Sequence, residues 1–195
     1  MQVISGKLRG LKIITPEGEQ TRPTLSRVKE AFFSSIQIDI VDTSFLDMFA
    51  GTGQMGIEAL SRGAARVVFI DTNTTYLIND NLQKIKKDAL DSNQSYKVLS
   101  IDITKKTSME SVGETFDYIY IDPPQKSEQI IDFSLLLDRI KKTNLIKING
   151  TIILEQKTDK NQTEYLGYNI IKHKIYGKTM LTYLMLIDQE TNLAT

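Results

Sequence analysis

The sequence predicts an α/β domain built on a mostly parallel sheet, and two observations support this prediction. Short apolar runs, each long enough for one strand, alternate with segments whose apolar residues recur every three to four positions. Such alternation is typical of strand–helix–strand units, whose right-handed crossovers produce parallel sheets. The last two apolar runs, residues 168–176 and 179–187, are joined only by a short turn at Gly177, which predicts an antiparallel hairpin.

The start of the chain predicts a small β element followed by a helix. Gly6 and Gly10 interrupt short apolar stretches, a pattern typical of a hairpin or of paired short strands. Thr24 is placed to cap a helix whose apolar residues follow the helical period. We therefore expect an N-terminal β arm over residues 1–23 and a main domain over residues 24–195.

The rest of the chain predicts alternating strands and helices. Strands are expected at residues 45–49, 66–71, 96–102, 116–122 and 151–155. Helices are expected at residues 54–61, where Gly63 provides a stop, at 75–90 and at 128–140. Ligands of such sheets bind at the carboxyl ends of the strands, so the loops that follow the strands are the place to look for a site.

Composition narrows the function classes. With 41% hydrophobic and 25% charged residues, the 195-residue chain has the composition of an ordinary globular protein. No apolar run approaches the length of a membrane span, and the first residues lack the features of a signal peptide, so we expect a cytoplasmic protein, favoured as a monomer. The absence of cysteine excludes thiolate chemistry, and one histidine is too few for most histidine metal sites, so we expect no metal.

The charge is balanced overall but basic near the N-terminus. The chain has 24 basic and 24 acidic residues, whereas residues 1–30 carry six basic and three acidic ones. A local excess of positive charge attracts phosphate, although a solvated basic face explains the same charges. The candidate RNA contacts are Lys7, Arg9, Arg22, Arg27 and Lys29.

A glycine-rich turn follows the first predicted strand. Gly51 and Gly53 allow the backbone to turn sharply and to approach a ligand, and the next helix directs its free N–H groups at that ligand. Asp71 ends the second strand and can accept hydrogen bonds from ribose hydroxyl groups. Asp102, at the end of the third strand, could accept a hydrogen bond from an adenine amine. The candidate cofactor residues are Asp47, Phe49, Ala50, Gly51, Gly53, Gly56, Asp71 and Asp102.

This pattern fits two cofactors that contain adenosine. The spacing of Gly51, Gly53 and Gly56, with Asp71 following, matches the dinucleotide fingerprint. Asp47 favours S-adenosylmethionine, because a carboxylate beside the glycines would repel a pyrophosphate but could receive a cationic amino group. A tight strand–helix turn without any ligand is a third interpretation.

A second motif, Asp122-Pro123-Pro124-Gln125, follows the fourth predicted strand. The prolines fix the backbone and remove two N–H donors, while their carbonyls remain acceptors. The Asp122 carboxylate and the Pro123 carbonyl could hold both hydrogens of an exocyclic amine, so that its nitrogen is positioned for in-line attack on a sulfonium methyl. A plain loop at the end of a strand is the alternative. The candidate catalytic residues are Asp122, Pro123, Pro124 and Gln125.

The chain also resembles a known family, the bacterial 16S rRNA guanine-N2 methyltransferases of the RsmD type. The blocks that carry the resemblance are residues 4–10, 21–30, 46–53, 58–64 and 122–124. The resemblance implies a Rossmann-like class I methyltransferase with a seven-stranded sheet, a C-terminal antiparallel hairpin and a small N-terminal β element. It also implies S-adenosylmethionine as cofactor and an unstacked guanine as target, in 16S rRNA of the 30S subunit or of an assembly intermediate.

Gln125 departs from the family pattern, which has Tyr or Phe at this position. An aromatic ring there would stack on the flipped base, a contact worth about 1–3 kcal/mol. Three alternatives stay open: a DNA adenine or cytosine amino methyltransferase, a nicotinamide-dependent oxidoreductase that only the glycine pattern supports, and an rRNA-binding assembly factor whose turnover is weakened or lost through Gln125.

Overall fold

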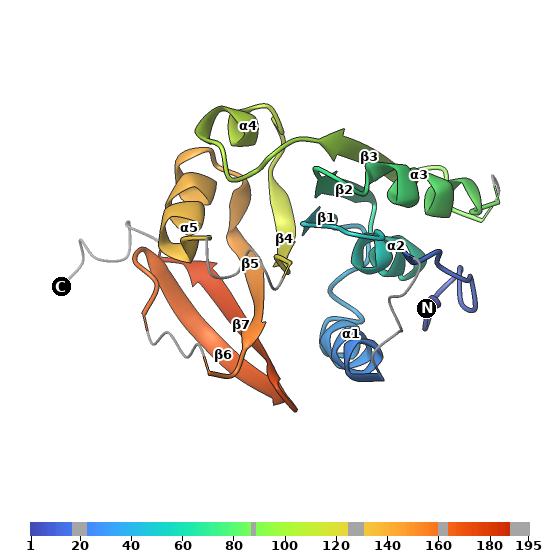
Figure 1. Cartoon of the computed structure of the whole chain (residues 1–195), viewed down its shortest axis with the longest axis horizontal. Helices are drawn as coiled ribbons and strands as arrows, with labels where there is room; N and C mark the ends of the chain where they lie inside the picture. The colour runs from blue at the N-terminus through green and yellow to red at the C-terminus, as the bar shows by residue number, and fades with distance from the viewer. Residues whose placement is uncertain (17–22, 87–88, 125–130, 160–163, 188–195) are drawn as a thin grey trace. The chain divides into compact units, whose positions relative to one another are not determined.

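The computed structural model shows two compact units, Met1–Ile103 and Thr104–Thr195 (Figure 1). The structure describes residues 1–16, 23–86, 89–124, 131–159 and 164–187. The predicted boundary between an arm and a main domain, at residue 23, adjoins a segment outside the described residues and stays a prediction.

The first unit contains a parallel sheet with the strand order β3-β2-β1. Its elements are α1 (Pro23–Ser35), β1 (Ser44–Met48), α2 (Gln54–Ser61), β2 (Arg66–Asp71), α3 (Thr75–Gln83) and β3 (Ser95–Ser100). β1 and β2 are buried along nearly their whole length, as expected for strands covered on both faces. On α1, Phe33 stacks on Phe45 of β1 with ring centroids 6.0 Å apart, and Phe32 meets Phe33 edge-on at 4.7 Å.

The second unit contains four strands in the order β4-β5-β7-β6. Its elements are α4 (Lys106–Glu110), β4 (Phe116–Ile121), α5 (Phe133–Lys142), β5 (Ile146–Lys157), β6 (Tyr168–Tyr176) and β7 (Thr179–Leu186). β4 and β5 are parallel, whereas β7 is antiparallel to both β5 and β6. Gly177 supplies the turn between β6 and β7 with a φ of 61°. The α/β class, the seven strands and the C-terminal antiparallel hairpin are thus confirmed.

The helix predicted at residues 75–90 is too long. α3 ends at Gln83 because the N–H groups of Lys84 and Ile85 bond to carbonyls three residues back, at 3.3 and 3.0 Å, which tightens and closes the last turn. The hydrophobic period alone does not reveal this change of hydrogen bonding. Thr24 is also not a cap, since α1 already begins at Pro23, whose fixed φ suits a first helical position.

The element ends also differ in the second unit. α5 begins at Phe133, because the Asp132 carboxylate accepts the N–H groups of Ser134 and Leu135 at 2.9 and 3.1 Å and so caps the helix. Residues 128–130 of the predicted helix lie outside the described part of the chain. β5 is longer than predicted, and the short helix α4 was not predicted.

Residues 1–16, here called the N-terminal segment, pack within the first unit. The predicted β element is reduced to a single antiparallel bridge between Gln2 and Lys12. Val3, Leu8 and Ile13 are buried. Three backbone hydrogen bonds also join its two halves. Side chains from the helices beneath it attach the segment to the rest of the unit.

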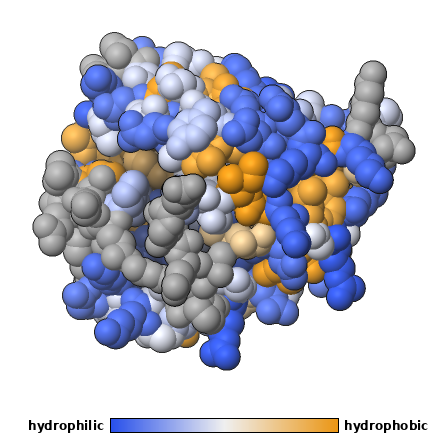
Figure 2. Space-filling view, turned by 45° about the vertical axis from the view of Figure 1, so that its right-hand side comes forward, coloured by the Kyte–Doolittle hydropathy of each residue, from blue (hydrophilic) through white to orange (hydrophobic). Residues whose placement is uncertain are grey.

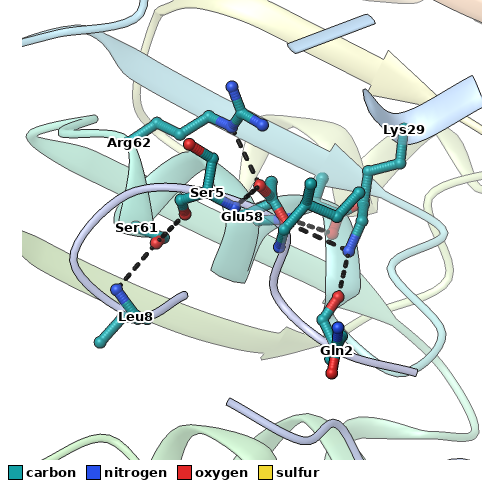
Figure 3. Close-up of polar contacts among 10 residues, drawn as sticks. Gln2, Ser5, Leu8, Lys29, Glu58, Ser61 and Arg62 are labelled. Carbon is teal, nitrogen blue, oxygen red and sulfur yellow. Dashed lines mark hydrogen bonds and ion pairs between the residues drawn. The ribbon is translucent and has the colours of Figure 1, made fainter. Parts of the chain in front are cut away.

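The Glu58 carboxylate of α2 accepts two of the hydrogen bonds that attach the segment (Figure 3). Glu58 is fully buried, and its Oε2 accepts the Ile4 N–H at 2.8 Å and lies 3.2 Å from Lys29 Nζ. Its Oε1 accepts the Ser5 N–H at 3.0 Å and the Arg62 Nε–H at 2.9 Å. Two cations and two amides thus offset the cost of removing one carboxylate from water.

Exposed apolar residues are scattered over the surface. On the face drawn in Figure 2, hydrophobic residues form separate patches among hydrophilic ones. Isolated apolar residues of this kind are normal on a protein surface. In the part of the chain that the structure describes, no helix combines the length and the apolar character that crossing a membrane requires.

We predict that Glu58→Ala lowers the free energy of unfolding by about 3–5 kcal/mol, because it leaves two buried cations without their carboxylate. The measurement is urea unfolding followed by circular dichroism. Asp138→Ala is the control: it removes an exposed carboxylate paired with Lys142 one helical turn away, a change worth at most about 1 kcal/mol. Equal losses for both variants would contradict the prediction.

Candidate functional site

The loop between β1 and α2, here called the glycine loop (residues 49–53), turns through three residues with positive φ. The angles are 65° at Phe49, 56° at Gly51 and 78° at Gly53. The Ala50 N–H bonds to the Ile70 carbonyl of β2 at 2.9 Å, and the Gly53 N–H bonds back to the Ala50 carbonyl at 2.7 Å. Phe49 is not a glycine, so its left-handed conformation costs roughly 1 kcal/mol, the kind of strain that functional loops retain.

Two glycines of the motif are also required by packing. Gly56 lies within α2, and a Cβ built there would come within 2.2 Å of Cε1 of Phe69, a β2 residue. A Cβ on Gly53 would come within 3.2 Å of Ile78 Cγ2. Gly56 therefore allows the first turn of α2 to lie against β2. Whether it also contacts a cofactor stays a prediction.

Asp47, in β1 just before the glycine loop, is almost completely buried. Only 2% of its surface is exposed, and its Oδ2 accepts the Gly56 N–H at 2.9 Å. Burial raises the pKa of this carboxyl to about 7; the hydrogen bond from Gly56 opposes the rise, and the negative charge of Asp71 adds to it. A cation placed beside Asp47 would keep it ionised, whereas an anion would be repelled.

Asp71 links the glycine loop to the loop after β2. One of its oxygens accepts the Gly51 N–H at 3.0 Å, and the other accepts the N–H groups of Asn73 and Thr74 at 2.8 and 3.0 Å. These three bonds use three of the roughly four acceptor positions of a carboxylate. Asp71 therefore fixes both loops, and its predicted bonds to ribose hydroxyl groups stay a prediction. Asp102 lies two residues beyond β3 instead of at its end, and it is half-buried.

The second motif lies in the second unit, directly after β4. Asp122 is half-buried, Pro123 is buried and Pro124 is exposed, while Gln125 lies outside the described residues. Their catalytic roles stay predictions.

Two buried polar groups were missed from the sequence. The Glu155 carboxylate on β5 is only 8% exposed and accepts a hydrogen bond from the Tyr120 hydroxyl on β4. In the sequence, the only feature that points to a buried Glu155 is its position directly after an apolar run of β5. The second is Asn81, a buried amide on the core-facing side of α3.

The predicted RNA contacts differ in accessibility. Lys7, Arg9 and Arg27 are exposed, and Lys7 forms an ion pair with Asp91. Arg22 lies outside the described part of the chain. The prediction for Lys29 is wrong: it is 2% exposed, because its ammonium is held by the Glu58 carboxylate and by the Gln2 carbonyl at 2.9 Å. Burial lowers the pKa of Lys29, and Glu58 opposes that change.

Comparison with solved structures identifies the fold. The fold is that of the Escherichia coli protein yhhF, with a TM-score of 0.75 and 23% identity over 97% of this chain and 99% of that one. SMU.776, solved in complex with SAH, has a TM-score of 0.61 and 13% identity over 84% of this chain and 50% of its own. The strand order within each unit and the glycine loop are those of a Rossmann-like α/β fold.

The sequence comparison identifies the family. Residues 1–185 match the family described as "Conserved hypothetical protein 95", and the chain belongs to it. A Haemophilus influenzae relative, named "Ribosomal RNA small subunit methyltransferase D", is 34% identical over 185 residues, which cover 91% of this chain and 89% of the relative. The resemblance to the RsmD-type family is thus confirmed.

We predict that the unfolding free energy of the wild type falls relative to that of Asp47→Asn as the pH rises from 5 to 7. The folded state holds the Asp47 proton with a pKa of about 7, above the ordinary value of 3.8. Between these values the folded state binds more protons, so stability is fully present at low pH and is lost as the pH rises through 7.

The expected relative loss is roughly 2–3 kcal/mol, since each pH unit between the two pKa values is worth about 1.4 kcal/mol. Urea unfolding at pH 5, 6, 7 and 8 measures it. Asn at this position keeps an acceptor for the Gly56 N–H and removes the charge, which isolates the titration. Parallel pH curves for the two proteins would show that Asp47 titrates normally.

Proposed function

We propose that this protein transfers a methyl group from S-adenosylmethionine to the exocyclic N2 amine of a guanine in 16S rRNA. Membership of the family and the name of the Haemophilus influenzae relative support an rRNA methyltransferase. The assignment of guanine as the target base, and of N2 as the methylated atom, rests on the resemblance to the RsmD-type family. The structural observation that carries the proposal is the buried Asp47 carboxyl at the start of the glycine loop.

The cofactor is S-adenosylmethionine. Its methionine part carries an ammonium group, and Asp47 suits a cation because a pKa near 7 leaves the carboxyl ready to ionise beside one. The pyrophosphate of a nicotinamide dinucleotide is negatively charged, so the same carboxylate would repel it. In our proposal the glycine loop contacts the methionine and ribose parts of the cofactor. Asp71 accepts a hydrogen bond from a ribose hydroxyl at its remaining acceptor position.

The acceptor amine is assigned to the Asp122–Pro124 motif. The Asp122 carboxylate and the Pro123 carbonyl accept the two amine hydrogens, which orients the nitrogen lone pair. Bound S-adenosylmethionine would supply an electrophilic methyl group on a sulfonium and would leave as the neutral thioether. Asp122 or water would take the proton that the methylated nitrogen releases.

The RNA is assigned to the exposed basic residues of the first unit. Lys7, Arg9 and Arg27 are exposed, and Arg22 is added from the sequence. The proposed partner is 16S rRNA in the 30S subunit or an assembly intermediate, acted on by a cytoplasmic monomer. Gln125 supports one second candidate, an assembly factor that binds rRNA and cofactor but transfers the methyl group poorly.

We predict that the protein transfers labelled methyl from S-adenosylmethionine to 30S subunits or 16S rRNA from a strain lacking the enzyme, and not to DNA. Nucleoside analysis of the product should give N2-methylguanosine, because the amine is the group that the acceptor motif holds. Transfer only to DNA would contradict the RNA assignment. Cofactor binding without transfer to any nucleic acid would favour the assembly factor.

We further predict that Asp122→Asn reduces the rate of methyl transfer by about 100-fold or more while S-adenosylmethionine still binds. Removing one preorganised polar contact from an active site usually slows the reaction by this factor. Asp117→Asn is the matched control, since it makes the same change on β4, the strand that Asp122 follows, at a carboxylate that pairs with Lys147. Similar rates for the Asp122 variant and the wild type would remove this motif from the mechanism.

A further inference from the structure

Asn81, a fully buried residue of α3, joins the N-terminal segment to the glycine loop. Its Oδ1 accepts the Ile14 N–H at 2.6 Å. Its Nδ2 donates to the Ile14 carbonyl at 3.1 Å and to the Thr52 carbonyl at 3.0 Å. Thr52 stands between the two glycines of the loop. One side-chain amide therefore connects the loop proposed to bind the cofactor with the segment proposed to contact RNA.

The chemistry of these contacts requires an asparagine. Two carbonyl oxygens face Nδ2 and one N–H faces Oδ1, so the reversed amide would bring an acceptor against two acceptors. An aspartate of the same shape would keep the bond from Ile14 but could not donate to the carbonyls when ionised. Because the group is buried, an unmade bond would not be replaced freely by water.

We infer that Asn81 is a positioning residue for the glycine loop and that cofactor affinity depends on its bond to the Thr52 carbonyl. This inference rests on the proposed function. The amide that holds the Thr52 carbonyl is itself held by both backbone groups of Ile14, which fixes its orientation toward the loop.

Ser61 provides a matched control in the same unit. Its hydroxyl is buried and accepts the Leu8 N–H at 2.9 Å, and it donates to the Ser5 carbonyl. Ser61 thus holds the N-terminal segment as Asn81 does, and neither of these bonds goes to the glycine loop. A variant at this position tests the effect of weakened docking and lost stability without loss of the direct contact to Thr52.

Calorimetric titration of the full chain with S-adenosylmethionine tests the inference on the wild type, Asn81→Ala, Asn81→Asp and Ser61→Ala. We expect both Asn81 variants to raise the Kd by about 5- to 20-fold, because each leaves the buried Thr52 carbonyl without its hydrogen bond. Ser61→Ala should lower the Tm but raise the Kd less than about 3-fold. In methyl transfer, the Asn81 variants should raise the KM for the cofactor and change kcat at saturation less than about 2-fold.

Other outcomes of the titration would contradict either the inference or the proposed function. Wild-type Kd values for the Asn81 variants would overturn the inference and leave the proposed function standing. A rise in Kd for Ser61→Ala as large as that for Asn81→Ala would reduce Asn81 to a purely structural role. If Asn81→Ala does not fold, Asn81→Asp carries the test, since it preserves the shape of the side chain. A wild type that does not bind S-adenosylmethionine would instead overturn the proposed function.

Discussion

The buried Glu58 carboxylate is the interaction on which the first unit depends. The N-terminal segment pairs mainly with itself, through a single antiparallel bridge and three backbone hydrogen bonds between its two halves, so it needs other contacts to attach to the unit. One carboxylate accepts two of its backbone N–H groups and pairs with the cations of Lys29 and Arg62. The same helix, α2, begins at the end of the glycine loop. The attachment of the N-terminal segment and the start of the candidate site are thus built on one rigid element.

Two buried carboxylates near α2 have opposite surroundings, and the contrast identifies the one that is suited to a ligand. Glu58 has two cations within 3.2 Å. Among the described residues no cation pairs with Asp47, and the charge of Asp71 adds to its cost of ionisation. A buried carboxyl of this kind destabilises the folded protein when ionised, unless a positive group approaches it. Such a cost is tolerated where a ligand offsets it, which fits the ammonium of the proposed cofactor.

The sequence predicted the elements whose signals are local. α2 and β2 begin and end as predicted, because apolar period, glycines and strand length agree there. The sequence could not predict where α3 ends, since its last turn closes through i−3 bonds. It also could not show that Gly56 is needed for packing as well as for the predicted cofactor contact, because the close approach to the Phe69 ring arises only when α2 packs on β2. Asn81 carries no motif, and only the structure reveals its partners.

The error at Lys29 shows why counting charges along a chain is insufficient. Lys29 was grouped with Arg27 as a phosphate contact, yet α1 directs Lys29 to Glu58 while Arg27 stays exposed. Residues two positions apart on a helix do not share a face, so a basic cluster in sequence divides between surface and core. A buried lysine paired with a carboxylate adds little to the field that phosphate would meet outside. The proposed RNA contact therefore uses the exposed cations of this unit, and Lys29 contributes indirectly by holding the segment that carries two of them, Lys7 and Arg9.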